Sequence, residues 1–361
     1  MPGRIEPHDR FVRVHFDGQR ADLRPDFHAD FHWTWLRLAC DQERHPVTNE
    51  PTLCPSRVDP SIHARAARIE GDVLLVEWAG EAPSRAPSRY SLAWLAERAY
   101  AVDHPLPPEP PRGPEPFEAQ AAEDGLLPAS WLERLERDGA LIVRGGAHTV
   151  SPETTERWIE QLERAGLGLV GTHFGRIEDL RTDNTTNANT DQLGYTDAAI
   201  DLHTDQPFLP EPPRYQLLHC VRSADRGGES TLADARAAAE WLRRNDAAAF
   251  EALTSLPVTF HRKQREFERV VVSPIFETHE GRFRRVRHSY FTMAPQRLPF
   301  EQLEPFYRAY RALARALERY RVETVLRPGD ALLYDNHRML HGRRAFSGPR
   351  WVRGVYFERR P

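Results

Sequence analysis

Short apolar runs bounded by turn residues recur along the chain and are typical of β-strands. The run "GDVLLVEWAG" at 71–80 is rich in β-branched and aromatic residues, and "ALIVRGG" at 140–146 is a short apolar run closed by glycines. From residue 200 onward similar runs follow one another, separated by glycine and proline turns, at 215–221, 282–291, 330–336 and 350–358. This pattern favours a mainly β fold with some helices, of the sandwich or jelly-roll kind.

Apolar residues at helical spacing interrupt these strands. The spacing occurs in three segments, 88–100, 233–245 and 300–320. Two further helices begin at recognisable caps. Ser130 stands three residues before Glu133, as in a capping box, and Ser151 precedes Pro152 in a segment that ends at Gly166.

Prolines concentrate in "DHPLPPEPPRGPEPFEAQ" at 103–120, too densely for a helix or a central strand, because each removes a backbone donor. A chain of 361 residues is long for one core. We therefore expect a small β-rich domain at 1–103, a proline-rich linker at 104–126 and a larger domain at 127–361.

Composition narrows the class of protein further. With 40% hydrophobic and 28% charged residues and a net charge of -4, the chain reads as globular, without the basic footprint of a nucleic-acid binder. No apolar run reaches membrane-spanning length, the start lacks a secretion-signal pattern, and three scattered cysteines do not make a disulfide framework. These features predict a cytoplasmic protein with no membrane partner.

Candidate metal chemistry begins at "LHTDQPF", where His203 and Asp205 are separated by one residue. Residues i and i+2 of a strand point to the same side, so both side chains can reach one ion. With 16 histidines a pair of this kind also arises by chance, and His28 with Asp30 is a second one. A third donor would come from "LLYDNHRMLHG", which offers His337 and His341. Two imidazoles and one carboxylate are the ligand set of non-haem iron oxygenases.

Taken together, "LHTDQPF…PPRYQLLHC…GGESTLADA" and "LLYDNHRMLHGRRAF…RWVRGVYFE" resemble the TauD/TfdA family of Fe(II)/2-oxoglutarate dioxygenases, and within it the γ-butyrobetaine and trimethyllysine hydroxylases. The resemblance covers residues 127–361. It implies a double-stranded β-helix (jelly-roll) core with His203, Asp205 and His341 as iron ligands. The presence of Asp205 implies hydroxylation or a related oxidation, because halogenating relatives have a small residue there.

The resemblance also implies the cosubstrates, 2-oxoglutarate and O2, and the release of succinate and CO2. An arginine after the distal histidine binds the far carboxylate of 2-oxoglutarate, a task that suits a planar guanidinium. Arg350 matches that position, with Arg353 as its rival, and Ser230 falls where relatives carry a hydroxyl near the cosubstrate. The alternative for Arg350 is a solvated arginine at a strand start, because the chain has 48 arginines.

The small-molecule substrate is predicted from the aromatic cage that holds a quaternary ammonium in these relatives. Tyr195, Tyr356 and Phe174 fall near cage positions, with core packing as the alternative for each. Glu178 stands where a tryptophan is usual, and Arg287 lies near the position of a substrate carboxylate partner. We therefore expect a substrate with a primary or secondary amine, such as an amino acid, with γ-butyrobetaine hydroxylation as the alternative.

The resemblance extends weakly to the N-terminal domain through "WTWLRLAC" and "SRYSLAWL". Relatives bind zinc there, which needs four good ligands. Cys40, His45 and Cys54 make three at best, and Gln42 occupies a cysteine position, so no structural zinc is expected. Relatives form dimer contacts through this domain, so the resemblance implies a homodimer as one option for this chain. Two other classes remain as alternatives, a non-catalytic jelly-roll sensor and a zinc hydrolase, although the chain lacks an H-E-x-x-H base.

Overall fold

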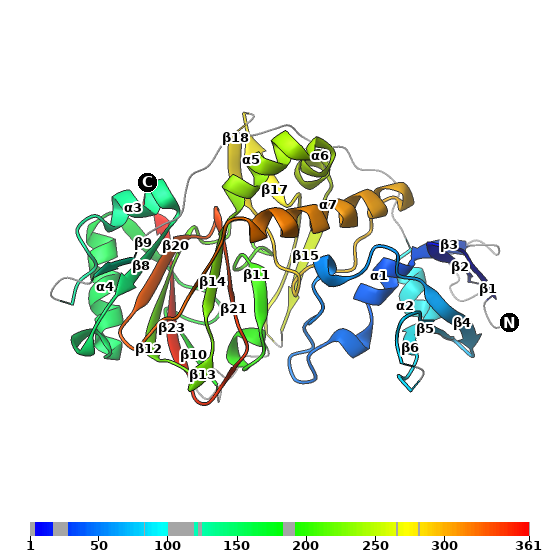
Figure 1. Cartoon of the computed structure of the whole chain (residues 1–361), viewed down its shortest axis with the longest axis horizontal. Coiled ribbons are helices and arrows are strands. Elements are labelled where there is room, and N and C mark those ends of the chain that lie inside the picture. Colours follow the sequence, from blue (N-terminus) through cyan, green and yellow to red (C-terminus); the bar gives the residue numbers. More distant parts are fainter. Residues whose placement is uncertain are drawn as a thin grey trace.

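The computed structural model describes residues 4–16, 28–82, 84–99, 119–121, 125–182, 192–264, 266–280 and 282–360 (Figure 1). Within this part of the chain, the larger sheet has seven strands. Their spatial order is β10 (Glu178–Arg181), β23 (Trp351–Arg359), β12 (Tyr215–Arg222), β20 (Ala331–Asp335), β8 (Ala140–Arg144) and β7 (Ala119–Ala121), and β9 (Leu167–Val170) pairs with β23. All pairs are antiparallel except β7 with β8.

A smaller sheet faces the larger one. Its strands, in order, are β11 (Ile200–His203), β21 (Met339–Arg343), β14 (Ser230–Asp234) and β19 (Arg321–Thr324). Because strand side chains alternate between faces, Leu332 and Tyr334 of β20 pack inward in one cluster with Leu232 and Met339 of the smaller sheet. Ala331 and Leu333 point the other way, into a cluster with two helices. The strands are therefore buried on both faces.

Helices cover the outer faces of both sheets. Against the larger sheet lie α3 (Trp131–Asp138) and α4 (Pro152–Arg164), and against the smaller lie α5 (Ala235–Asn245), α6 (Ala247–Ser255) and α7 (Phe300–Glu318). Three two-stranded ribbons complete this region, β15 (Val258–Lys263) with β16 (Glu268–Ser273), β17 (Phe276–His279) with β18 (Arg282–Val286), and β13 (Arg226–Gly227) with β22 (Phe346–Ser347).

The N-terminal segment lies at the end of the molecule opposite α3 and α4 (Figure 1). It contains two three-stranded sheets and two short helices: β1 (Arg4–Pro7), β2 (Phe11–His15) and β3 (His28–His32); β4 (Ala64–Glu70), β5 (Val73–Trp78) and β6 (Ser88–Ser91); α1 (Trp33–Leu38) and α2 (Leu92–Glu97). Its apolar core is continuous with that of α7. Trp35 Nε1 donates to the carbonyl of Gln296 at 3.1 Å, and Arg311 Nη1 donates to the carbonyl of Val58 at 2.8 Å.

The prediction of a mainly β fold with a few helices is confirmed, and local details differ in three places. Ser130 precedes α3 but makes no side-chain cap bond, because its ψ of 5° is not the extended conformation that turns a cap hydroxyl toward the first turn. The segment 88–100 begins as strand β6 before α2. Helix α6 was missed because its sequence "AAAFEALTS" has no clear polar stripe. Ser151, as predicted, caps α4 by accepting from Glu153 N.

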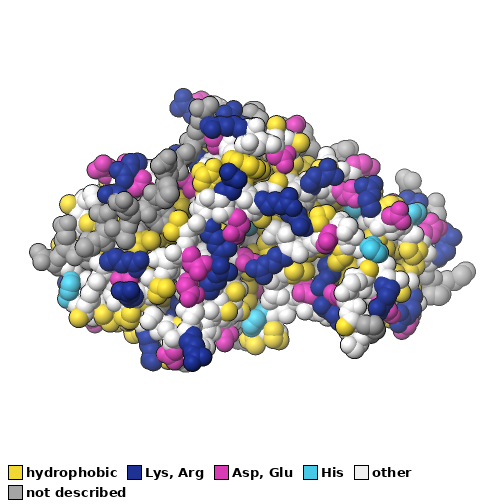
Figure 2. Space-filling view, in the orientation of Figure 1, with side chains coloured by type: hydrophobic (Ala, Val, Ile, Leu, Met, Phe, Trp, Pro, Cys, Tyr) yellow, Lys and Arg dark blue, Asp and Glu magenta, His cyan; other side chains and the backbone are white. Residues whose placement is uncertain are grey.

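Most of the predicted linker at 104–126 lies outside the described residues, so the domain boundaries remain predictions. Among the described helices, none is both long and apolar enough to span a membrane. On the face drawn in Figure 2, basic and acidic side chains are interspersed, as the small net charge of -4 leads one to expect.

Candidate active site

Three potential metal donors meet at one edge of the smaller sheet. His203 ends β11 and lies opposite His341 of β21 in the antiparallel register, so both imidazoles project from the same face. Asp205 follows two residues after His203. Its Oδ1 atom lies 3.5 Å from His203 Nε2 and 3.9 Å from His341 Nε2, and the three donor atoms all lie within 4.8 Å of one another.

Neighbouring polar groups orient these donors. The Nδ1 atom of His203 lies 2.9 Å from the carbonyl oxygen of Asp201, which can only accept, so Nδ1 carries the proton and Nε2 presents its lone pair. Asn336 bridges the two chain segments: its Oδ1 accepts from Asp205 N at 2.8 Å, and its Nδ2 donates to Asp205 O at 3.1 Å. Tyr356 donates to Asp205 Oδ2 at 2.7 Å, which leaves Oδ1 facing the histidines.

The protonation states of this cluster suit a divalent metal. Burial, followed by the proximity of His203, lowers the pKa of His341 to about 3, so its imidazole is neutral. Burial alone would raise the pKa of Asp205, but His341 and His203 outweigh it and hold that pKa well below its usual range. Two imidazoles and one carboxylate on one face are the donor set of non-haem iron, and the residues therefore fit Fe(II).

The other candidate donors do not join this cluster. His28 and Asp30 lie on β3, where both carboxylate oxygens of Asp30 accept from Arg13 of β2, at 2.7 and 2.8 Å. His337 Nε2 lies 2.8 Å from the carbonyl of Pro212. Cys40 Sγ lies 3.0 Å from Ser88 Oγ. In the described part of the chain, His203, Asp205 and His341 are the one group of this kind.

The three donors open into a cavity whose empty space, together with the open solvent at its mouth, is about 870 Å³. Five of the other predicted site residues line it: Phe174, Glu178, Ser230, Arg350 and Tyr356. Several further apolar and polar side chains also line it, among them Leu180, Leu218, Val352, Phe208, Phe291, Gln206, Ser289, Glu50 and Arg262. Sequence reasoning missed Glu50 and Arg262, which lie in segments without a motif.

Arg350 and Arg353 have different surroundings. Arg350 lines the cavity with its guanidinium carbon 5.5 Å from the ring centre of Phe346, and among the described residues no carboxylate pairs with it. Burial lowers the pKa of Arg350 to about 10, which leaves it charged at neutral pH. Arg353 donates to the carbonyl of Pro152 at 2.6 Å and pairs with Asp179 at 3.3 Å. Of these two arginines, Arg350 is thus the one placed to meet an anion in the cavity.

Glu178 is buried beside the metal donors. Its Oε1 accepts from Gln192 Nε2 at 2.6 Å, and its Oε2 lies 3.3 Å from the Tyr356 hydroxyl. Burial, followed by the charge of Asp205, raises the pKa of Glu178 to about 8, so the carboxyl is mostly protonated at neutral pH. Tyr195 also hydrogen-bonds to Glu178 and is itself buried, so it supports Glu178 and is not among the side chains that line the cavity.

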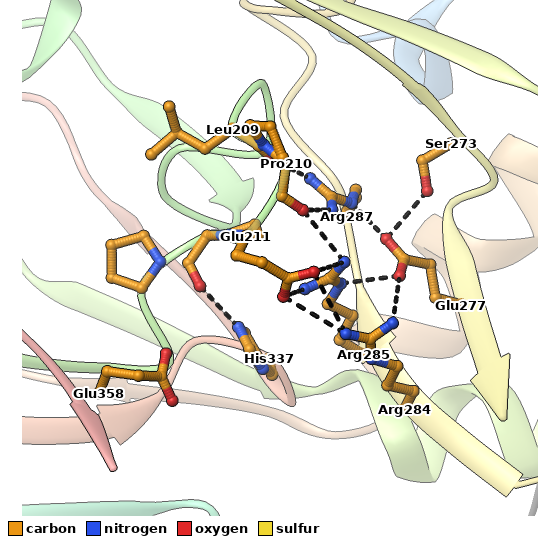
Figure 3. Close-up of polar contacts among 12 residues, drawn as sticks. Leu209, Pro210, Glu211, Ser273, Glu277, Arg284, Arg285, Arg287, His337 and Glu358 are labelled. Carbon is orange, nitrogen blue, oxygen red and sulfur yellow. Dashed lines mark hydrogen bonds and ion pairs between the residues drawn. The ribbon is translucent and has the colours of Figure 1, made fainter. Parts of the chain in front are cut away.

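Arg287 requires a correction, because the structure does not place it at the cavity. Figure 3 shows its guanidinium between Glu277 and the chain at Pro210. It donates to the carbonyls of Pro207 at 2.7 Å, Leu209 at 2.6 Å and Pro210 at 2.7 Å. On β18 and just after it, side chains alternate in direction, and Arg287 points under the loop that follows Asp205. It holds that loop in place and does not meet a substrate carboxylate.

Comparison with known proteins gives the family. The model of the family described as "Taurine catabolism dioxygenase TauD, TfdA family" matches residues 103–356. The chain belongs to the TauD/TfdA family. The matched range includes the three candidate metal donors and Arg350. The family assignment from the sequence is confirmed, as is the enzyme class, an Fe(II)- and 2-oxoglutarate-dependent dioxygenase.

Curated TauD/TfdA relatives match nearly the whole chain. Trimethyllysine dioxygenase of Gallus gallus is 28% identical over 95% of this chain and 84% of its own length. Gamma-butyrobetaine dioxygenase of Pseudomonas sp. (strain AK-1) is 29% identical over 92% of this chain and 88% of its own length. Among solved structures, PvcB from Pseudomonas aeruginosa is 24% identical over 73% of this chain and 97% of that chain, with a TM-score of 0.49.

Proposed function

We propose that this TauD/TfdA-family enzyme oxidises an unactivated C–H bond of a small amine- or amino-acid-like substrate. The observation that carries the proposal is one cavity lined by the three clustered donors, by Arg350 and by buried Glu178. His203, Asp205 and His341 would hold Fe(II). We further infer that the two facing sheets are a double-stranded β-helix (jelly-roll) core and that the segment before residue 103 is a separate small domain.

Arg350 and Ser230 would bind 2-oxoglutarate. An arginine with no protein carboxylate in contact can offer a two-pronged pair of N–H donors to the far carboxylate of the cosubstrate. Ser230 lies on β14, next to β21, which carries His341, so its hydroxyl is within the same cavity. When bound, Fe(II) would allow O2 to act as the oxidant, with 2-oxoglutarate as the co-reductant that leaves as succinate and CO2.

Glu178 would receive the substrate's amine. A protonated carboxyl can pass its proton out of the cavity when an ammonium arrives, after which the carboxylate and the ammonium form a buried pair. Phe174, Phe208 and Phe291 line the same cavity and would exclude water around the carbon to be oxidised. This arrangement favours an amine with N–H donors, because a quaternary ammonium has none to give to a carboxylate.

A betaine substrate is the second candidate. It is favoured by two aromatic cavity residues, Tyr356 and Phe174, and by relatives named as trimethyllysine and gamma-butyrobetaine dioxygenases. Paired primary amines and their trimethylated forms, compared by succinate formation, separate the two candidates. Faster coupled turnover of the primary amine supports the proposal, whereas faster turnover of the trimethylated form favours a betaine substrate.

The metal and cosubstrate assignments have a direct test. Anaerobic addition of Fe(II) and 2-oxoglutarate should produce the weak visible charge-transfer band of the chelate, and an accepted amine should increase succinate formation in air. His341→Ala and Asp205→Ala should abolish both signals. His28→Ala, which alters the other His-x-Asp pair, should change neither. Absence of the band in the wild-type protein, together with no substrate-stimulated succinate, would contradict the proposal and favour a sensor role.

A further inference from the structure

A buried ion pair closes the cavity on the side of the N-terminal segment. Glu50 lies between β3 and β4, and Arg262 lies on β15, yet Arg262 Nη1 donates to Glu50 Oε1 and both side chains line the cavity. Each residue is only 5% exposed. Glu50 Oε2 also accepts from the backbone N–H of Leu193. The N-terminal segment thus contributes a charged group directly to the wall of the site.

A chain of polar contacts links this pair to the metal donors. From Asp205 it passes to Tyr356 at 2.7 Å, from Tyr356 to Glu178 at 3.3 Å and from Glu178 to Gln192 at 2.6 Å. The next residue after Gln192 is Leu193, whose N–H donates to Glu50. In this chain of contacts, counted from Asp205, Glu178 comes before the Glu50–Arg262 pair, and all three side chains line the same cavity.

Two more polar side chains of the cavity lack partners within the described residues. Both amide atoms of Gln206 and the hydroxyl of Ser289 are buried without a hydrogen bond, and both residues line the cavity. Gln206 also has a φ of +54°, a strained conformation for a non-glycine residue, directly after Asp205. Buried polar groups of this kind are usually satisfied, because leaving one unpaired is destabilising. A ligand in the cavity would satisfy them.

Residues 288–292, which include Ser289, connect these groups to Arg262. At the start of this segment, Thr204 N donates to the carbonyl of His288 at 2.6 Å, which places Gln206 close to the segment in the fold. At its other end, His261 N donates to the carbonyl of Thr292 at 2.7 Å, next to Arg262. Gln206, Ser289 and Arg262 therefore line one continuous stretch of wall.

An anchoring role alone does not account for these observations. A buried ion pair gains little stability over well-packed apolar residues, because removing two charges from water offsets their attraction. Packing the N-terminal segment against β15 does not require charge, and it leaves the amide of Gln206 unexplained. Binding of a ligand carboxylate accounts for the charged pair, the amide N–H of Gln206 and the hydroxyl of Ser289, because these groups are donors to a carboxylate; the amide oxygen of Gln206 would accept from an N–H or O–H of the same ligand.

We propose that Arg262, held in place by Glu50, binds the carboxylate of the substrate, with Gln206 and Ser289 as further donors. The inference rests on the proposed function, and it makes the substrate a zwitterion with its amine at Glu178 and its carboxylate at Arg262. It gives Arg262 the role that the sequence had suggested for Arg287. The N-terminal segment takes part in substrate recognition through Glu50.

The test compares acids with their amides. L-leucine, L-lysine and 5-aminopentanoate are each paired with the corresponding carboxamide, and binding to the Fe(II)–2-oxoglutarate protein is followed by the change in the visible band. In the wild-type protein at least one acid should bind about tenfold or more tightly than its amide. Arg262→Gln should reduce that ratio to near one without changing the affinity for 2-oxoglutarate. Arg269→Gln, which removes an exposed arginine of the same hairpin, should leave the ratio unchanged.

The double variant E50Q/R262Q is the control for a folding defect in Arg262→Gln. Arg262→Gln alone leaves Glu50 buried without its cation. In the double variant, the two glutamine side chains can instead form a neutral hydrogen bond with each other. The double variant should fold and form the band, yet fail to prefer the acid. Equal binding of acids and amides by the wild-type protein, or no response to any acid with the band intact, would overturn the inference and leave the metal chemistry standing. Absence of the band would instead overturn the proposed function.

Discussion

The raised pKa of Glu178 makes a quantitative prediction about stability in the metal-free protein. Burial, with the charge of Asp205, raises this pKa from 4.5 to about 8 in the folded state. Because the folded pKa lies above the unfolded one, the stability contributed by the protonated carboxyl is complete below pH 4.5 and is lost as the pH rises toward 8. At about 1.4 kcal/mol for each pKa unit, the loss is roughly 3–5 kcal/mol.

Glu178→Gln tests this reasoning, because an amide has the shape of the protonated carboxyl and does not ionise. The variant should match the wild-type protein near pH 4.5 and become progressively more stable than it up to pH 8, by several degrees in Tm. The assay is thermal unfolding of both proteins after metal removal, at half-unit pH steps from 4.5 to 9. All other titrating groups are shared, so they cancel in the difference.

The control is Glu160→Gln, at an exposed position on α4. Its difference from the wild-type protein should show no steep dependence on pH in this range. Parallel Tm curves for Glu178→Gln and the wild-type protein would refute the reasoning, since they would mean that Glu178 ionises in the folded state as easily as in water.

Three further predictions concern residues around the cavity. Tyr356→Phe removes the donor to Asp205 Oδ2 and should weaken Fe(II) binding about 10- to 100-fold in a metal titration. Unchanged affinity would show that the Asp205 carboxylate does not need this hydrogen bond to be oriented for metal binding. Arg350→Gln should raise the KM for 2-oxoglutarate about tenfold or more while Fe(II) affinity stays constant, and an unaltered KM would point to another cation. Arg287→Met leaves the carbonyls of Pro207, Leu209 and Pro210 without this donor and should cost about 3–5 kcal/mol in urea unfolding. Arg284→Met, at a half-exposed member of the cluster in Figure 3, should cost under about 1 kcal/mol.

Much of the framework was predictable from local pattern. The apolar runs at 215–221, 330–336 and 350–358 became β12, β20 and β23, because strands buried on both faces read as continuous apolar segments. His203, Asp205 and His341 were predicted as a set because the motifs around them occur together in one family. The structure brings the three side chains to one face, as the i, i+2 spacing and the pairing of β11 with β21 require.

Side-chain direction and long-range pairing were beyond the reach of sequence. Nothing near Arg287 indicates that it points beneath the loop at 207–210 and away from the cavity, since a one-residue change in register reverses a strand's faces. His28 and Asp30 are distinguished from the proposed metal pair, His203 and Asp205, by their register opposite β2, where Arg13 pairs with the Asp30 carboxylate.

The sequence by itself therefore determined the family, the mainly β architecture and the three candidate metal donors, because each depends on residue type and short-range spacing. Only the tertiary structure decided which residues from distant segments meet in the wall of the cavity. Glu50 and Arg262 are 212 positions apart and meet because the N-terminal segment packs against α7 and β15. Glu178 likewise owes its raised pKa to burial beside Asp205, and burial is a property of the folded chain that no local pattern contains.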